Sequence, residues 1–144
     1  MTHASRNTTT GLIFEEKIIL NKDGINLSKH TLYEYLKKNK IDWTKIISRK
    51  LLPDEAYFNP ETKEFNIFEK KFQQTEGSAD EKPQTCGFKI WEFSKIGKAI
   101  GAEKITYIYI LNNWFKQEKY KDMLEYITMV PNCDYIFEDE IGEN

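Results

Sequence analysis

Residues 52–73 read LPDEAYFNPETKEFNIFEKKFQ, and this stretch decides the fold. Two runs rich in aromatic residues, 52–58 and 65–73, flank a turn signal at Asn59 and Pro60. Short β-favouring runs on either side of turn residues are typical of a β-hairpin. The sequence therefore predicts two neighbouring strands joined by a tight connection.

The second predicted strand carries polar side chains on one of its faces. Successive side chains of a strand point to opposite faces, so Glu69, Lys71 and Gln73 share a face. Asp54 on the neighbouring strand is able to approach them. Mg²⁺ usually takes one or two carboxylates together with water and substrate phosphate oxygens. The pattern predicts a site in which Asp54 and Glu69 bind Mg²⁺, with Mn²⁺ as a substitute, and Lys71 orients or deprotonates an attacking water.

Two alternatives remain open from the residues alone. Glu55 competes with Asp54 as a ligand, because a bulge or a one-residue shift in register would exchange the faces of their side chains. The same charges could also decorate a solvated hairpin, in which Glu and Lys form cross-strand pairs. Lys70 faces away from the site if the strand is regular.

The motif resembles that of the PD-(D/E)XK nuclease superfamily. Pro53-Asp54 is followed, after fourteen residues, by Glu69-Lys70-Lys71, with Gln73 just beyond. The segment 69–82, which ends in Glu81-Lys82, is similar to small restriction-type endonucleases of bacteria, phages and large DNA viruses. The resemblance implies an α/β fold with an αβββαβ core, whose mixed central sheet is flanked by helices.

The same resemblance implies the activity, a magnesium-dependent hydrolysis of DNA phosphodiester bonds. It also implies helper roles for Gln73 and for a glutamate on the first helix, for which we choose Glu15; Glu81 and Lys82 receive no role. We expect a type II restriction-like enzyme on double-stranded DNA, acting as a homodimer because cutting a duplex takes two active sites. The alternatives are a structure-specific nuclease of the Holliday-junction-resolvase type and a non-catalytic DNA-binding or assembly domain of the same fold.

Length and composition fit this expectation. A chain of 144 residues suits one domain, 1–144, with 1–7 and 139–144 expected as flexible termini. No apolar run is long enough for a membrane span and no signal-peptide core is present, so we expect a cytoplasmic protein without membrane contacts. Cys86 and Cys133 lie far apart in sequence, without the paired spacing of metal ligands. The sequence contains no phosphate-binding loop motif, and we expect no small-molecule cofactor.

Charge is unevenly distributed along the chain. Residues 1–50 hold ten Lys or Arg against five Asp or Glu, whereas residues 118–144 hold two against eight. The basic part could contact DNA phosphates, and Lys29 is one of the candidates.

Periodicity and turn signals predict the remaining elements. Before the hairpin we expect a capped helix over 8–20, a helix from Ser28 to about Lys38, and a short helix or turn in 41–49 leading to a first strand near 46–51. After it we expect a helix after Ser78, a buried strand over 105–111 beside the strand with Glu69, a helix over 119–127 and a strand over 133–137.

Overall fold

The computed structural model describes residues 11–14, 17–75 and 83–142. It shows an α/β fold with a mixed five-stranded sheet. The strand order is β3 (Ile25–Asn26), β4 (Glu55–Asn59), β5 (Glu64–Lys71), β6 (Lys104–Leu111) and β7 (Cys133–Phe137). The first three of these strands pair antiparallel, and β5, β6 and β7 pair parallel.

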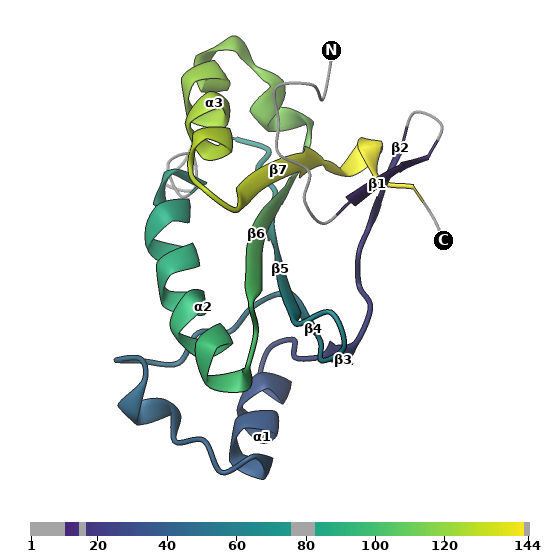
Figure 1. Ribbon diagram of the computed structural model, residues 1–144. Helices are drawn as coiled ribbons and strands as arrows, with labels where there is room; N and C mark the ends of the chain where they lie inside the picture. Colours follow the sequence, from purple (N-terminus) through teal and green to yellow (C-terminus); the bar gives the residue numbers. More distant parts are fainter. Residues whose placement is uncertain (1–10, 15–16, 76–82, 143–144) are drawn as a thin grey trace.

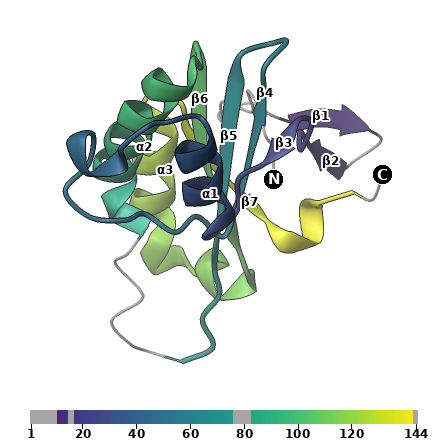
Figure 2. The same cartoon turned by 90° about the horizontal axis from the view of Figure 1, so that it is seen from below.

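The helices α1 (Thr31–Lys38), α2 (Cys86–Ile100) and α3 (Lys121–Met129) lie on one side of the sheet (Figures 1 and 2). The hairpin of β1 (Gly11–Phe14) and β2 (Lys17–Leu20) lies on the other side (Figure 2). Short 3₁₀ helices in the described part of the chain include η1 (Trp43–Lys45), η3 (Asn113–Lys116), η4 (Glu118–Tyr120) and η5 (Glu138–Glu140).

Alternation along β5 produces two separate cores. Phe65 and Ile67 are buried in the large cluster beneath the helices, while Phe68 is buried in a smaller cluster with Ile18 and Leu20 of β2. Because each face of a strand takes every second side chain, the two cores together fix which face receives Glu69. The predicted hairpin of β4 and β5 and the predicted buried strand β6 beside β5 are confirmed.

The predicted helix over 8–20 is wrong, because 11–14 and 17–20 form the β1–β2 hairpin. In β2, Ile18 and Leu20 are buried while Lys17 is exposed, which is the two-residue period of a half-buried strand. The run of apolar residues fits either period in sequence, and packing against Phe68 decides for the strand. Glu15, which we expected on this helix, lies outside the described residues.

The predicted strand near 46–51 is also wrong. Ile47 and Leu51 are buried in the large core, but the segment is irregular. The Leu51 N–H donates to the Tyr33 hydroxyl oxygen at 2.5 Å, and that hydroxyl donates to the Leu51 carbonyl at 2.6 Å. These two bonds take the place of the backbone pairing that a strand in this segment would make. The edge position beside β4 is occupied instead by β3, which precedes α1.

The later elements follow the predictions with shifted ends. α1, α3 and β7 occupy the expected segments, and α2 is described from Cys86 onward, whereas Ser78 lies outside the described residues. Near the C-terminal end, the Gly142 N–H donates to the Ile18 carbonyl at 2.9 Å and Lys116 pairs with Asp139 at 2.9 Å, and flexibility of 139–144 stays a prediction. None of the described helices is long and apolar enough to cross a membrane.

Gly24 enables the close approach of the segment before β3 to β4. Its φ is +106°, and an added Cβ would collide with the carbonyl group of Phe58. Gly101 has a similar φ of +92° with open space around it.

We expect Gly24→Ala to lower the free energy of unfolding by about 3 kcal/mol, the sum of backbone strain and collision. Gly101→Ala should cost only the strain, about 1 kcal/mol. Urea denaturation measures both, and equal losses would contradict the close approach.

Candidate metal and phosphate site

The register of the β4–β5 hairpin brings Asp54 beside Glu69. Glu55 pairs with Phe68, so Asp54, one residue before β4, comes opposite Glu69. The Asp54 N–H donates to Glu69 Oε2 at 2.9 Å, and the Lys70 N–H donates to Asp54 Oδ2 at 2.9 Å. Each carboxylate is therefore held by a backbone N–H of the other strand.

Glu55 lies on the opposite face of the hairpin. Its carboxylate accepts a hydrogen bond from the Tyr57 hydroxyl at 3.0 Å and pairs with Lys22 at 2.8 Å. Lys70 also reaches it, at 3.8 Å. The regular register thus separates Glu55 and Lys70 from the face that carries Asp54.

Lys29 supplies a contact that the sequence does not predict. Its Nζ donates to Asp54 Oδ1 at 2.8 Å, and its backbone N–H donates to the Pro53 carbonyl at 2.8 Å. Lys29 has a φ of 52°, a left-handed conformation that lysine rarely adopts. Sequence reasoning assigns Lys29 to DNA contact, whereas its ammonium lies against the predicted metal ligand. Only the pairing of β3 with β4 makes this contact.

Lys71 and Gln73 have different surroundings. Lys71 shares the face of Glu69, and its positive charge favours the ionised forms of both Asp54 and Glu69. Gln73 lies beyond the end of β5, where its backbone N–H and C=O bond the Asn112 side chain at 3.2 and 2.7 Å. Its side-chain amide donates to the Thr75 carbonyl at 2.7 Å. The fold brings Asp54, Glu69 and Lys71 together, while these contacts of Gln73 tie the ends of β5 and β6.

The two carboxyl groups have pKa values displaced in opposite directions. Partial burial opposes ionisation of Asp54, but hydrogen bonds from Lys29 and the Lys70 backbone, with the nearby lysine charges, hold its pKa below the ordinary value. At Glu69 burial is the largest influence and raises the pKa, and the adjacent charge of Asp54 raises it further. Two acids placed side by side repel each other, and a divalent cation between them would relieve that repulsion.

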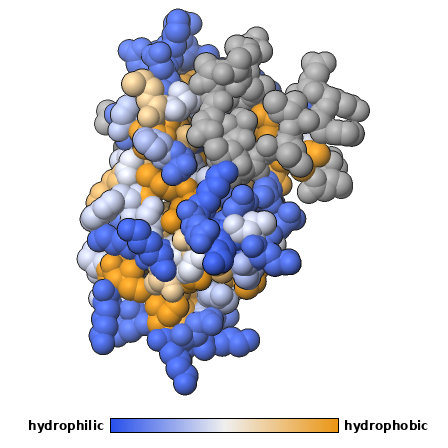
Figure 3. All heavy atoms as spheres, viewed as in Figure 1, coloured by the Kyte–Doolittle hydropathy of each residue, from blue (hydrophilic) through white to orange (hydrophobic). Residues whose placement is uncertain are grey.

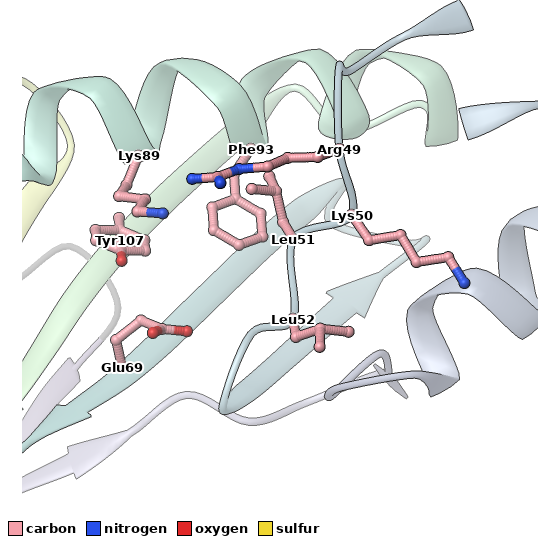
Figure 4. A pocket seen from close by; sticks show the side chains of 8 residues that line it. All are labelled: Arg49, Lys50, Leu51, Leu52, Glu69, Lys89, Phe93 and Tyr107. Atoms are coloured by element: carbon pink, nitrogen blue, oxygen red, sulfur yellow. The ribbon is translucent and has the colours of Figure 1, made fainter. Parts of the chain in front are cut away.

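A pocket of about 220 Å³ opens on the Glu69 side of the sheet. Its lining residues are Arg49, Lys50, Leu51, Leu52, Glu69, Lys89, Phe93 and Tyr107. Figure 4 shows the Glu69 carboxylate on one wall, with Arg49 and Lys89 extending across the opposite wall and Lys50 pointing away toward α1. Cations facing a carboxylate across an open pocket suit a phosphate bridged to a metal ion.

Sequence reasoning misses Arg49, Lys89 and Tyr107 as members of this site. Arg49 comes from the irregular segment after η1, Lys89 from α2 and Tyr107 from β6. Nothing in their local sequence distinguishes them from other basic or aromatic residues, because only packing of these elements brings them to Glu69. Glu81 and Lys82 lie outside the described residues.

The donor set fits Mg²⁺ better than a transition metal. Within the described part of the chain, no group of three or more His, Cys, Asp or Glu side chains gathers. Two carboxylates are what Mg²⁺ ordinarily takes from a protein, the other positions being water and phosphate oxygens. Asp54 and Glu69 could hold such an ion, and Lys71, Arg49 and Lys89 could neutralise a phosphate beside it.

Comparison with known proteins adds no relative: no protein-family model, curated protein or solved structure matches this chain.

Glu69→Gln should raise the Tm of the metal-free protein by a few degrees at pH 7. Because the folded state raises the pKa of Glu69, the ionised form destabilises folding above that pKa, and glutamine removes the charge. The gain should shrink near pH 4, about the ordinary pKa of glutamate, where both states bind the proton. Thermal unfolding in EDTA at both pH values measures the difference. A wild-type protein more stable than the variant at pH 7 would contradict the repulsion.

Proposed function

We propose that this chain is a magnesium-dependent DNA endonuclease of the PD-(D/E)XK type. The observation that carries the proposal is the pairing of Asp54 with Glu69 across the hairpin, on the face that also holds Lys71. Two acids and an amine in this arrangement match the residues that the motif predicts. The charged pocket beside Glu69 supports a phosphodiester as the substrate.

The roles of the residues follow from their positions. Mg²⁺, when bound, supplies a Lewis acid that stabilises negative charge on the phosphate. Asp54 and Glu69 would hold the ion, and Lys71 would orient the attacking water or take its proton. Arg49 and Lys89 would hold the phosphate from the opposite wall of the pocket (Figure 4).

The arrangement of the sheet supports the αβββαβ core in part. β4, β5, α2 and β6 follow one another along the chain, and β5 and β6 pair in parallel. The departure is at the edge, because β3 precedes α1 instead of following it. In the proposed enzyme this departure brings Lys29 to Asp54 and leaves the hairpin of β4 and β5 unchanged.

Nicking of supercoiled plasmid tests the proposal. We expect Mg²⁺-dependent nicking that falls about a hundredfold or more in Asp54→Asn, Glu69→Gln and Lys71→Ala, because the first two remove a metal ligand and the third removes the amine that acts on the attacking water. Glu55→Gln and Lys70→Ala are matched controls, since they remove the same chemical groups from the opposite face and should retain most of the activity. Equal loss in Lys70→Ala and Lys71→Ala would contradict the assignment.

The substrate in this assay distinguishes the alternatives. A type II restriction-like enzyme, acting as a homodimer, should linearise plasmid at fixed positions, whereas a structure-specific nuclease should prefer a four-way junction. DNA binding without cleavage in either Mg²⁺ or Mn²⁺ would favour a non-catalytic domain of the same fold.

Metal binding should depend on pH. Because the pKa of Glu69 is raised, protons compete with the metal at a higher pH than at an ordinary glutamate. Calorimetric titration of the protein with Mn²⁺ should show affinity that weakens as the pH is lowered from neutral. Asp54→Asn should remove most binding and Glu55→Gln should not. An affinity that does not change with pH, or that Asp54→Asn leaves as high as Glu55→Gln does, would contradict a metal site at Asp54 and Glu69.

A further inference from the structure

A second pocket, of about 410 Å³, lies between the C-terminal end of α1 and η1. Its lining residues are Tyr33, Lys37, Lys40, Ile41, Asp42, Trp43 and Lys50. The Tyr33 and Trp43 rings pack edge to face, with centroids 5.8 Å apart. The Lys50 ammonium lies 5.1 Å from the Tyr33 centroid and 5.8 Å from that of Trp43. The pocket therefore offers aromatic surface and a cation together.

The charges around this pocket are mostly positive. Three lysines line it against one acid, Asp42, whose carboxylate accepts bonds from the Thr44 N–H at 3.0 Å and hydroxyl at 2.6 Å. Within the described part of the chain, no acidic side chain pairs with Lys37 or Lys40. An anion entering the pocket would meet Lys37 and Lys40 without competition from an acidic partner among the described residues.

Lys40 occupies a backbone position that usually belongs to glycine. Its φ is 59°, and it follows the C-cap of α1, where the Ile41 N–H bonds the Leu36 carbonyl at 2.8 Å. Such helix ends favour glycine because a side chain is strained there. At this backbone position the side chain of Lys40 lines the aromatic pocket, where a glycine would be less strained but would carry no charge.

The two pockets share one lining residue, Lys50. In Figure 4 the Lys50 side chain leaves the Glu69 pocket in the direction of α1. A nucleic acid strand with one phosphate beside Glu69 could thus continue past Lys50 to the pocket at Trp43.

We propose that the pocket at Trp43 binds an unpaired nucleotide of the DNA substrate. Aromatic side chains stack on bases of any sequence, and lysines neutralise the adjoining phosphates. The base lies against Trp43, and its phosphates lie against Lys37, Lys40 and Lys50. The inference rests on the proposed nuclease function and deepens it, because it makes frayed, flipped or single-stranded nucleotides part of what the enzyme recognises.

Fluorescence of Trp43 in EDTA measures binding without cleavage. In a variant with Trp91→Phe and Trp114→Phe, Trp43 is the remaining tryptophan. A single-stranded hexathymidylate should quench it, and a blunt duplex of equal length should quench it less. Trp43→Ala in the otherwise unchanged protein should weaken the binding of a labelled hexathymidylate about tenfold or more, measured by anisotropy.

Lys40→Gly separates binding from folding, because it removes the charge and also relieves the strained backbone. The variant should unfold at a Tm no lower than the parent's, while its affinity for the oligonucleotide falls and the salt dependence of log Kd decreases by about 0.7, the value for one phosphate contact. Lys63→Gly is the matched control, since Lys63 also has a positive φ, of 60°, but lines neither of these pockets. It should leave the affinity unchanged.

Three results would overturn the inference: no quenching by the oligonucleotide, equal affinity in Lys40→Gly and Lys63→Gly, or displacement by polyglutamate as effective as by the oligonucleotide. The last would indicate an acidic peptide site. Quenching without any plasmid nicking would refute the proposed nuclease and leave the nucleotide pocket standing. Nicking without quenching would refute the pocket alone.

Discussion

The antiparallel pairing of β4 with β5 is the constraint on which the rest of the structure depends. Its register puts Asp54 opposite Glu69 and gives each carboxylate a backbone N–H from the other strand. The positions of both acids are thereby set by main-chain geometry, which is stiffer than a side-chain contact. The parallel pairing of β5 with β6 then fixes this hairpin in the centre of the sheet.

The electrostatics of the site conflict with stability. Glu69 is partly buried beside another acid, an arrangement that raises its pKa and opposes folding at neutral pH. Lys29 offsets part of the opposing charge through its ion pair with Asp54, but an ion pair this exposed to solvent contributes little to stability. Perturbed carboxylates kept in a charged pocket are typical of functional sites, where stability is given up for chemistry.

The uneven charge of the chain has a spatial counterpart. The basic amino-terminal part includes α1 and the irregular segment that carries Arg49 and Lys50, at one end of the molecule (Figure 1). The acidic carboxyl-terminal part includes α3, at the other end (Figure 1). Hydrophilic side chains cover both ends of the face in Figure 3, and apolar patches lie among further hydrophilic side chains between the ends. Both pockets adjoin the basic end, which is the end suited to a polyanion.

The sequence alone determined the hairpin of β4 and β5, the buried strand β6 and the shared face of Glu69 and Lys71, because aromatic runs, turn residues and a two-residue period are local properties. It did not determine the β1–β2 hairpin, since the apolar run there fits either a helix or a strand. Only the packing of Ile18 and Leu20 against Phe68 decides for the strand. Lys29, Arg49 and Lys89 were decided by the tertiary structure. Lys29 comes from the turn between β3 and α1, Arg49 from an irregular segment and Lys89 from α2. No local pattern encodes contacts between elements that only core packing brings together.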